Sequence, residues 1–182
     1  MGYGSAMERD DIEAAIRSAF AGVRLGSGVS LQEARLIYER RTDLSQAAFD
    51  AIPRLEITDD WAAIPEEELE NDCIAHLDAE GLRYYLPALM FWLLDHYDDD
   101  YLLRGPEARM TKISTIAALA RSSKDAKDSQ RRWDGFTDDQ RAAIASYLDA
   151  LPRLVDLDYE DTVFVARSLE ANWHSYLGGD GK

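Results

Sequence analysis

The stretch from Ala79 to Tyr97 constrains the fold most, because at helical periodicity its apolar residues leave almost no polar side. A helix that is apolar around its whole circumference has to be covered by other elements. Asp78 precedes the stretch as a candidate N-cap, and Pro87 lies inside it. Proline removes one backbone N–H, so we expect a kink in this helix. The longest apolar run, 84–94, is shorter than the roughly 20 residues of a membrane span. The stretch is therefore predicted to be the central helix of a globular domain.

Capping signals and apolar stripes indicate further helices along the chain. Ser30 with Glu33, and Thr137 with Gln140, form the pattern of a capping box, in which two side chains satisfy each other's backbone N–H groups. Periodicity predicts helices over 8–20, 30–41, 45–52, 65–70, 111–123, 137–151 and 160–177, and no clean alternating strand pattern occurs. The sequence thus predicts an all-α, single-domain bundle of about six to eight helices around a central buried, Pro-kinked helix.

The limits of the domain are expected at 8–177. Residues 1–7 have the composition of an appended leader and are expected to be disordered, and 178–182 to form a flexible tail. The lone Cys73 cannot form an intramolecular disulfide and is expected in the core. No cationic and apolar secretion signal opens the chain, so we expect a cytoplasmic protein.

The distribution of charge is the strongest functional signal. The net charge is −15, and residues 56–100 hold 14 acids but a single base, Arg83. Such a field repels nucleic-acid phosphates and anionic membranes, and it speeds encounter with a basic partner. A solubilising acidic surface is the simpler alternative. Asp98, Asp99 and Asp100 add a local conflict, because acids are unfavourable at the C-terminal end of a helix.

We interpret part of this acidic segment as a binding surface for a basic protein. Trp61 is included because it lies beside two acids on a segment without clear periodicity, where an aromatic side chain would suit an interface. The predicted partner-binding residues are Asp59, Asp60, Trp61, Glu66, Glu67, Glu70, Asp72, Asp98, Asp99 and Asp100.

Motifs that carry chemistry are not found. The three histidines, His76, His96 and His174, have no metal-ligand spacing, and the acidic run 95–100 lacks the glycine and final glutamate of a calcium loop. No nucleophile elbow, Walker loop or dinucleotide fingerprint occurs. We therefore predict no catalytic residue, no metal and no cofactor.

Three stretches together resemble a known family. They are Ala19–Val23 leading to Gly28–Ala34, then Leu-Asp-Ala-Glu-Gly-Leu-Arg-Tyr-Tyr-Leu-Pro-Ala over 77–88, then Phe136–Gln140 with Tyr147 and Leu148. In this order and spacing they are similar to a bacterial family of small proteins described only as a domain of unknown function. The resemblance covers about 8–150 and implies a single helical bacterial domain, without an activity, cofactor or catalytic residue.

The function that we expect from these observations is protein binding. The most concrete form is an immunity or antitoxin-type protein that neutralises a basic toxin by direct binding. The alternatives are a regulatory or scaffold domain with another partner, and an enzyme with a dispersed site in which Glu80, Arg83 and Tyr84 form the polar cluster. Neither nucleic acid nor membrane is an expected partner, and the oligomeric state stays open.

Overall fold

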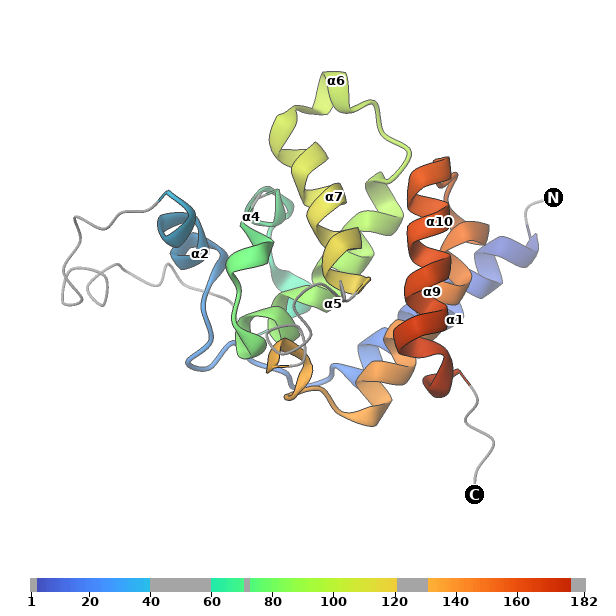
Figure 1. Ribbon diagram of the computed structural model, residues 1–182, viewed down its shortest axis with the longest axis horizontal. Coiled ribbons are helices and arrows are strands. Elements are labelled where there is room, and N and C mark those ends of the chain that lie inside the picture. The colour runs from blue at the N-terminus through green and yellow to red at the C-terminus, as the bar shows by residue number, and fades with distance from the viewer. Residues whose placement is uncertain (1–2, 40–59, 71–72, 121–130, 178–182) are drawn as a thin grey trace.

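The central helix expected from the sequence is α5 (Ala79–His96), and helices from both halves of the chain pack against it (Figure 1). The computed structural model describes residues 3–39, 60–70, 73–120 and 131–177. Every regular element in these ranges is helical, and one hydrophobic core joins residues from Ile16 to Trp173. The elements besides α5 are α1 (Tyr3–Ala19), α2 (Leu31–Tyr38), η1 (Trp61–Ala63), α4 (Glu66–Leu69), η2 (Ile74–His76), α6 (Tyr101–Arg104), α7 (Pro106–Leu119), α9 (Asp138–Leu154), α10 (Tyr159–Ser168), η4 (Leu169–Trp173) and η5 (His174–Tyr176). The prediction of an all-α, single-domain bundle is confirmed.

The burial of α5 follows from its sequence. Leu89 and Leu93 are completely buried, as its apolar circumference predicts. Asp78 caps the helix, because its Oδ1 accepts a hydrogen bond from the Gly81 backbone N at 2.8 Å. The helix continues without a break through Pro87, so the proline does not end it. The kink at this proline stays a prediction.

The loop before α2 crosses the first turn of α5 at two glycines. A Cβ atom on Gly81 would lie 2.3 Å from the carbonyl oxygen of Val29, and one on Gly28 would lie 2.6 Å from the backbone N of Gly81. Only glycine lets two backbones approach this closely. Asp78 ties the crossing together, because the oxygen that caps α5 also accepts a hydrogen bond from Val29 N at 3.0 Å.

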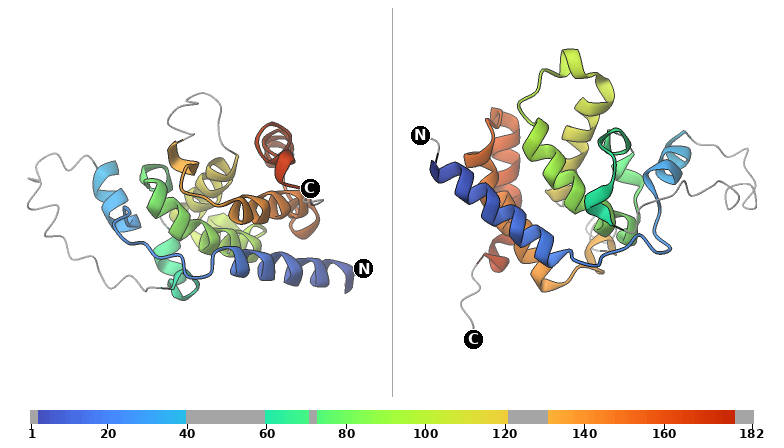
Figure 2. Two further views of the ribbon diagram at one scale, coloured as in Figure 1. Left: turned by 90° about the horizontal axis from the view of Figure 1, so that it is seen from below. Right: turned by 180° about the vertical axis from the view of Figure 1, so that it is seen from behind.

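Helices α1 and α9 lie side by side along the bundle (Figure 2). The predicted capping box opens α9, where Thr137 and Gln140 satisfy each other's backbone N–H groups. The same Gln140 donates through Nε2 to the carbonyl of Ala19 at 3.2 Å, at the end of α1. The other capping box, at Ser30, opens α2 as predicted.

Several helix limits differ from the prediction. Helix α7 spans Pro106–Leu119 where periodicity predicts 111–123, and the helix predicted over 160–177 is divided into α10, the π-helical turn η4 and the 3₁₀ turn η5. Helix α1 begins at Tyr3 rather than at residue 8, so the helix includes most of the expected leader. Helix α9 continues past Pro152 to Leu154, and the backbone N of Val155 closes its last turn on the carbonyl of Leu151 at 3.1 Å. Pro152 removes only its own N–H there, and this loss is tolerated in the last turn. The expected helix over 45–52 and the tail 178–182 lie outside the described residues.

The four tryptophans of the chain are all buried. Trp173, in the π-helical turn η4, donates through Nε1 to the carbonyl of Leu119 at 2.9 Å. Its ring stands edge-on to Trp133, with centroids 4.9 Å apart. Cys73 is also completely buried, as predicted. Across the described ranges, the structure has no helix with the length and apolar content to cross a bilayer.

Candidate partner-binding site: an acidic face with an apolar tip

Arg104 brings together two acidic runs that are far apart in the sequence. Its Nε donates to Glu70 Oε1 at 2.8 Å, and its Nη1 donates to Asp99 Oδ2 at 2.8 Å. Its Nη2 also pairs with Glu66. The guanidinium, whose side chain is only 22% exposed, therefore holds α4 against the turn that follows α5. One arginine compensates three carboxylates here, and bonds of this charge-assisted kind are the stronger class.

The same cluster accounts for the acids at the C-terminal end of α5. The His96 ring lies between two carboxylates, with Nε2 3.3 Å from Glu66 and Nδ1 2.9 Å from Asp99. The Tyr101 hydroxyl donates to the carbonyl of His96 at 2.5 Å and so satisfies one of the last carbonyls of the helix. Burial raises the pKa of Tyr101, and the charges of Asp99, Asp98 and Glu70 raise it further. The phenol therefore stays protonated and remains a donor.

We define the acidic face as the three carboxylates that pair with Arg104, together with the exposed carboxylates next to them on α4 and on either side of α6. Glu67 is exposed on α4, Asp100 caps α6 by accepting from Leu102 N at 2.9 Å, and Glu107 is exposed in the first turn of α7. Sequence reasoning missed Glu107 because it lies beyond the acidic block. The acidic face consists of Glu66, Glu67, Glu70, Asp99, Asp100 and Glu107.

Three of the other predicted partner residues serve the fold. Trp61 is buried and donates through Nε1 to the carbonyl of Phe20 at 3.0 Å, so the expectation that it faces a partner is wrong. The prediction took the acids beside Trp61 as a sign of a binding surface, whereas Asp60 caps η1. Asp98 accepts a hydrogen bond from the backbone N of Asp156 at 3.1 Å and is thus directed to the loop after α9. Asp59 and Asp72 lie outside the described residues.

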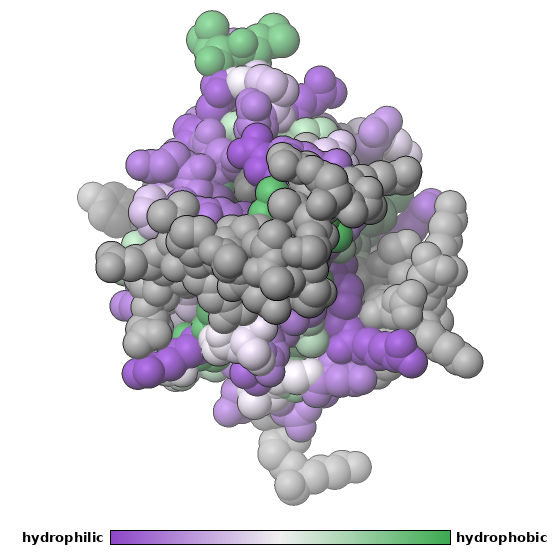
Figure 3. Space-filling model, turned by 90° about the vertical axis from the view of Figure 1, so that its left-hand side faces the viewer, coloured by the Kyte–Doolittle hydropathy of each residue, from purple (hydrophilic) through white to green (hydrophobic). Residues whose placement is uncertain are grey.

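Two leucines that the sequence analysis did not single out stand next to the acidic face. Leu102 is 94% exposed and Leu103 is 86% exposed, and both belong to α6. We call this pair the apolar tip. Figure 3 shows a hydrophobic knob at the height of α6, above a mostly hydrophilic surface. The signal in the sequence was an acidic cap, Asp100, followed within one turn by Gly105 and Pro106, which delimits a very short helix.

A hollow of about 230 Å³ lies beside the acidic face, between α1, η1, α4 and α5. Aromatic rings and charged groups line it, among them Arg17, Trp61, Glu66, Phe91, Asp95 and His96. The charged groups already have partners on the protein. Asp95 pairs with Arg9, and the Arg17 guanidinium lies 4.6 Å above the centre of the Phe91 ring. These contacts join α1 to α5, which is a structural role.

The three residues of the polar cluster in the enzyme alternative each contact another part of the protein. Glu80 accepts a hydrogen bond from the Ser27 hydroxyl at 2.7 Å, and Arg83 donates to the carbonyl of Gly135 at 2.8 Å. Tyr84 is completely buried, with its ring edge-on to that of Tyr85. Each of the three is thus engaged by a different part of the chain. Within the ranges that the structure describes, His, Cys, Asp and Glu side chains do not gather in a metal-binding group.

These features define an all-α domain that combines an acidic face with an exposed apolar tip. Over residues 8–177 the chain matches the family described as a family of unknown function (DUF6714), and it belongs to that family. The resemblance to an uncharacterised domain family is thereby confirmed. No curated protein and no solved structure matches the chain.

Replacing Arg104 by methionine should destabilise the protein by about 2 kcal/mol at low salt. The change keeps most of the aliphatic stem but leaves Glu66, Glu70 and Asp99 facing one another without a cation. Because salt screens this repulsion, the loss should shrink as ionic strength rises. Urea unfolding at two salt concentrations measures both effects. The exposed Arg167→Met, on α10, is the control, and a loss no larger than that of the control would contradict the role of Arg104.

Proposed function

We propose that this chain is a bacterial, cytoplasmic protein-binding domain that recognises a basic protein through its acidic face. The observation that carries the proposal is the convergence of two acidic runs, 66–70 and 95–100, on one side of the bundle. Arg104 neutralises part of this charge, and Glu67, Asp100 and Glu107 remain exposed around it. Carboxylates held in fixed positions favour charge complementarity with a partner of opposite sign.

The most concrete form of the proposal is an immunity or antitoxin-type protein that neutralises a basic toxin by direct binding. Two properties support it. The domain is small and built from helices, and Arg104 holds the carboxylates of Glu70 and Asp99 in fixed positions. A rigid acidic surface of this kind suits fast and tight association with a cationic protein.

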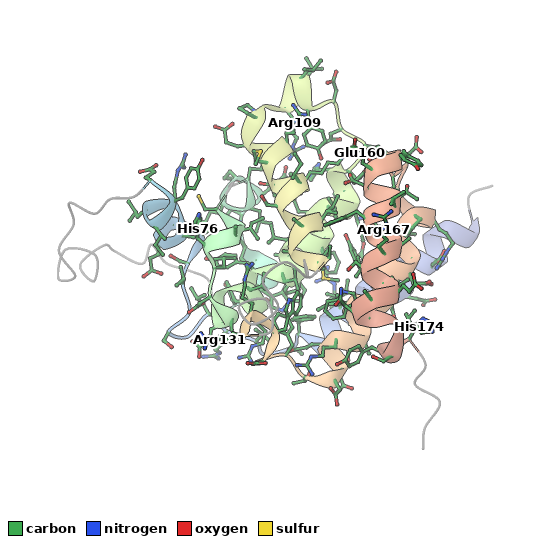
Figure 4. The ribbon with its side chains drawn as sticks, viewed as in Figure 1. His76, Arg109, Arg131, Glu160, Arg167 and His174 are labelled. Atoms are coloured by element: carbon green, nitrogen blue, oxygen red, sulfur yellow. The ribbon has the colours of Figure 1, made fainter. Side chains whose placement is uncertain are left out.

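The acidic face is tested by reversing charge at residues that do not hold the fold together. Glu67→Lys with Glu107→Lys changes the face, and Asp134→Lys with Glu170→Lys changes the net charge equally on exposed residues elsewhere. Asp134 and Glu170 are close in sequence to Arg131 and His174, which lie at the end of the molecule opposite to α6 (Figure 4). The partner is purified from cells that produce this chain naturally, and association is measured by biolayer interferometry over a range of salt concentrations.

We expect the first pair to slow association about tenfold at low salt and to flatten its salt dependence. The control pair should have a much smaller effect, because its charges lie far from the contact. Neither pair should lower the melting temperature appreciably. A partner of low isoelectric point, or association that is indifferent to salt and to the first pair, would rule out the proposed function.

The toxin-neutralising form has its own test. If the gene of this chain lies next to a gene for a secreted toxin, co-production of the chain should restore the growth of cells that make the toxin. Glu67→Lys with Glu107→Lys should weaken that protection. An orphan gene, or a neighbouring toxin that this chain does not neutralise, would favour a regulatory or scaffold role with a different partner.

A further inference from the structure

The apolar tip is exposed beyond what the fold requires. Single apolar residues are common on protein surfaces, but Leu102 and Leu103 are adjacent and almost completely exposed at the apex of the molecule (Figures 1 and 3). They add no burial to the core and present apolar surface to water. Exposed apolar side chains of this kind are typical of a surface that a binding partner covers.

The tip is also held in a fixed position before any partner arrives. Asp100 caps the first turn of α6, and Arg104 anchors the last turn to Glu70 and Asp99. Gly105 then turns the chain into α7 with a φ of 112°, in a region that favours glycine. A side chain that is already ordered loses little conformational entropy on binding, so its buried area contributes more fully to affinity.

A hollow of about 500 Å³ adjoins the apolar tip, and both apolar and charged side chains line it. Tyr101, Leu102 and Pro106 supply its apolar surface, and Asp99 and Asp100 supply carboxylates. Arg109 also lines the hollow. Asp99 is already paired within the protein, so Asp100 supplies the exposed carboxylate. Lysine and arginine have an aliphatic stem and a cationic head, and they match a lining that combines apolar side chains with such a carboxylate.

The charge around the tip distinguishes a basic protein from other occupants. A symmetric dimer through the tip would place two acidic faces against each other, because the same surface takes part on both sides. An anionic bilayer would be repelled by the same carboxylates. A basic protein surface with an apolar pocket is complementary to both the leucines and the acids.

We propose that the apolar tip is the anchor of the interface, with Leu102 and Leu103 inserted into an apolar pocket of the basic partner and a lysine or arginine of that partner in the adjoining hollow. The inference rests on the proposed function, and it names the residues that would hold the partner. The acidic face steers the encounter, and the tip determines how long the complex lasts. Hot spots of this kind are few, central and surrounded by polar residues.

The test uses a random peptide display library as a defined probe. The library is selected on the native chain, and the enriched peptides are then measured on Leu102→Asp with Leu103→Asp. Tyr159→Asp is the matched control, because Tyr159 is 83% exposed on another helix. Circular dichroism and thermal melting confirm that each variant is folded, which the exposure of all three residues leads us to expect.

We expect the enriched peptides to combine lysine or arginine with large apolar residues. Their affinity should fall about thirtyfold or more on the tip variant and stay within about twofold on the Tyr159 variant. Basic peptides that bind the tip variant as tightly as the native chain, but not Glu67→Lys with Glu107→Lys, would overturn the inference and leave the proposed function intact. Tip-dependent peptides without basic residues would overturn both.

Three further outcomes count against the inference. One is a selection that yields no peptide dependent on the tip. The second is binding to phosphatidylglycerol vesicles, and the third is self-association in sedimentation velocity, if either is present in the native chain and lost in the tip variant. The second outcome would assign the leucines to a bilayer, and the third would assign them to a second copy of the chain.

Discussion

Gly81→Ala should destabilise the protein by about 3 kcal/mol, although glycine to alanine stabilises an ordinary exposed helix by about 1 kcal/mol. The sign reverses because the new methyl group would lie 2.3 Å from the carbonyl oxygen of Val29. To relieve this overlap, the loop before α2 has to move away from α5. That movement also breaks the hydrogen bond from Val29 N to Asp78. Urea unfolding followed by circular dichroism measures the loss.

Two further variants make this prediction specific. Gly135→Ala is the control, because its methyl group would lie 3.8 Å from the nearest atom, on Arg83. It should change stability by less than about 0.5 kcal/mol. Gly28→Ala strains the same crossing, so the double variant with Gly81→Ala should lose less than the sum of the two single variants. A Gly81→Ala protein as stable as the native one would show that the loop yields without cost.

Leu89→Ala should lower the free energy of unfolding by about 2–5 kcal/mol. Leu89 is completely buried in the middle of α5, where the deleted methyl groups lose their contacts and leave a cavity. Leu93→Ala, one turn further along, should have a similar effect. Leu102→Ala is the control, because Leu102 is 94% exposed and should contribute almost nothing to stability. Chemical denaturation gives all three values, and a loss below about 1 kcal/mol at Leu89 would contradict a central position for α5.

These two predictions concern parts of the fold that differ in how far the sequence could predict them. The central position of α5 follows from its apolar circumference, and the caps at Ser30, Asp78 and Thr137 follow from residue types at fixed local spacing. Such signals act within one or two helical turns, so a single sequence contains them completely. The glycine crossing depends instead on which loop meets which helix, and periodicity does not contain that information.

In the candidate site, too, the local features could be predicted from the sequence and the tertiary contacts could not. The excess of acids was visible in the sequence, but Arg104 is separated from Glu66 by 38 positions, so the pairing depends on the tertiary fold. The sequence predicts that the acids at 98–100 are unfavourable at a helix end, whereas the structure gives Asp99 a cation and Asp100 a role as a cap. The local conflict at the end of α5 is thus partly resolved within the fold. The exposed charge that remains, at Glu67, Asp100 and Glu107, is the part that supports the proposal.

Trp61 shows why composition misleads at single residues. Two acidic neighbours suggested a surface position, but the indole is buried against the end of α1 through its bond to Phe20. In a short 3₁₀ turn, one side chain can point inward while its neighbours stay in water. Periodicity cannot indicate that direction, because a turn of three residues has no repeat.

The burial of all four tryptophans determines what intrinsic fluorescence can report about this protein. In the native state each indole is shielded from water, so emission should be blue-shifted, and unfolding should move it strongly to the red. The rings of Trp133 and Trp173, 4.9 Å apart, are close enough to exchange excitation energy, which should lower the polarisation of the emitted light. The apolar tip carries no such reporter. A partner that binds there can reach an indole only through Arg104, whose guanidinium lies 5.6 Å from the centre of the Trp92 ring, so an extrinsic fluorophore is the more direct way to follow the complex by light.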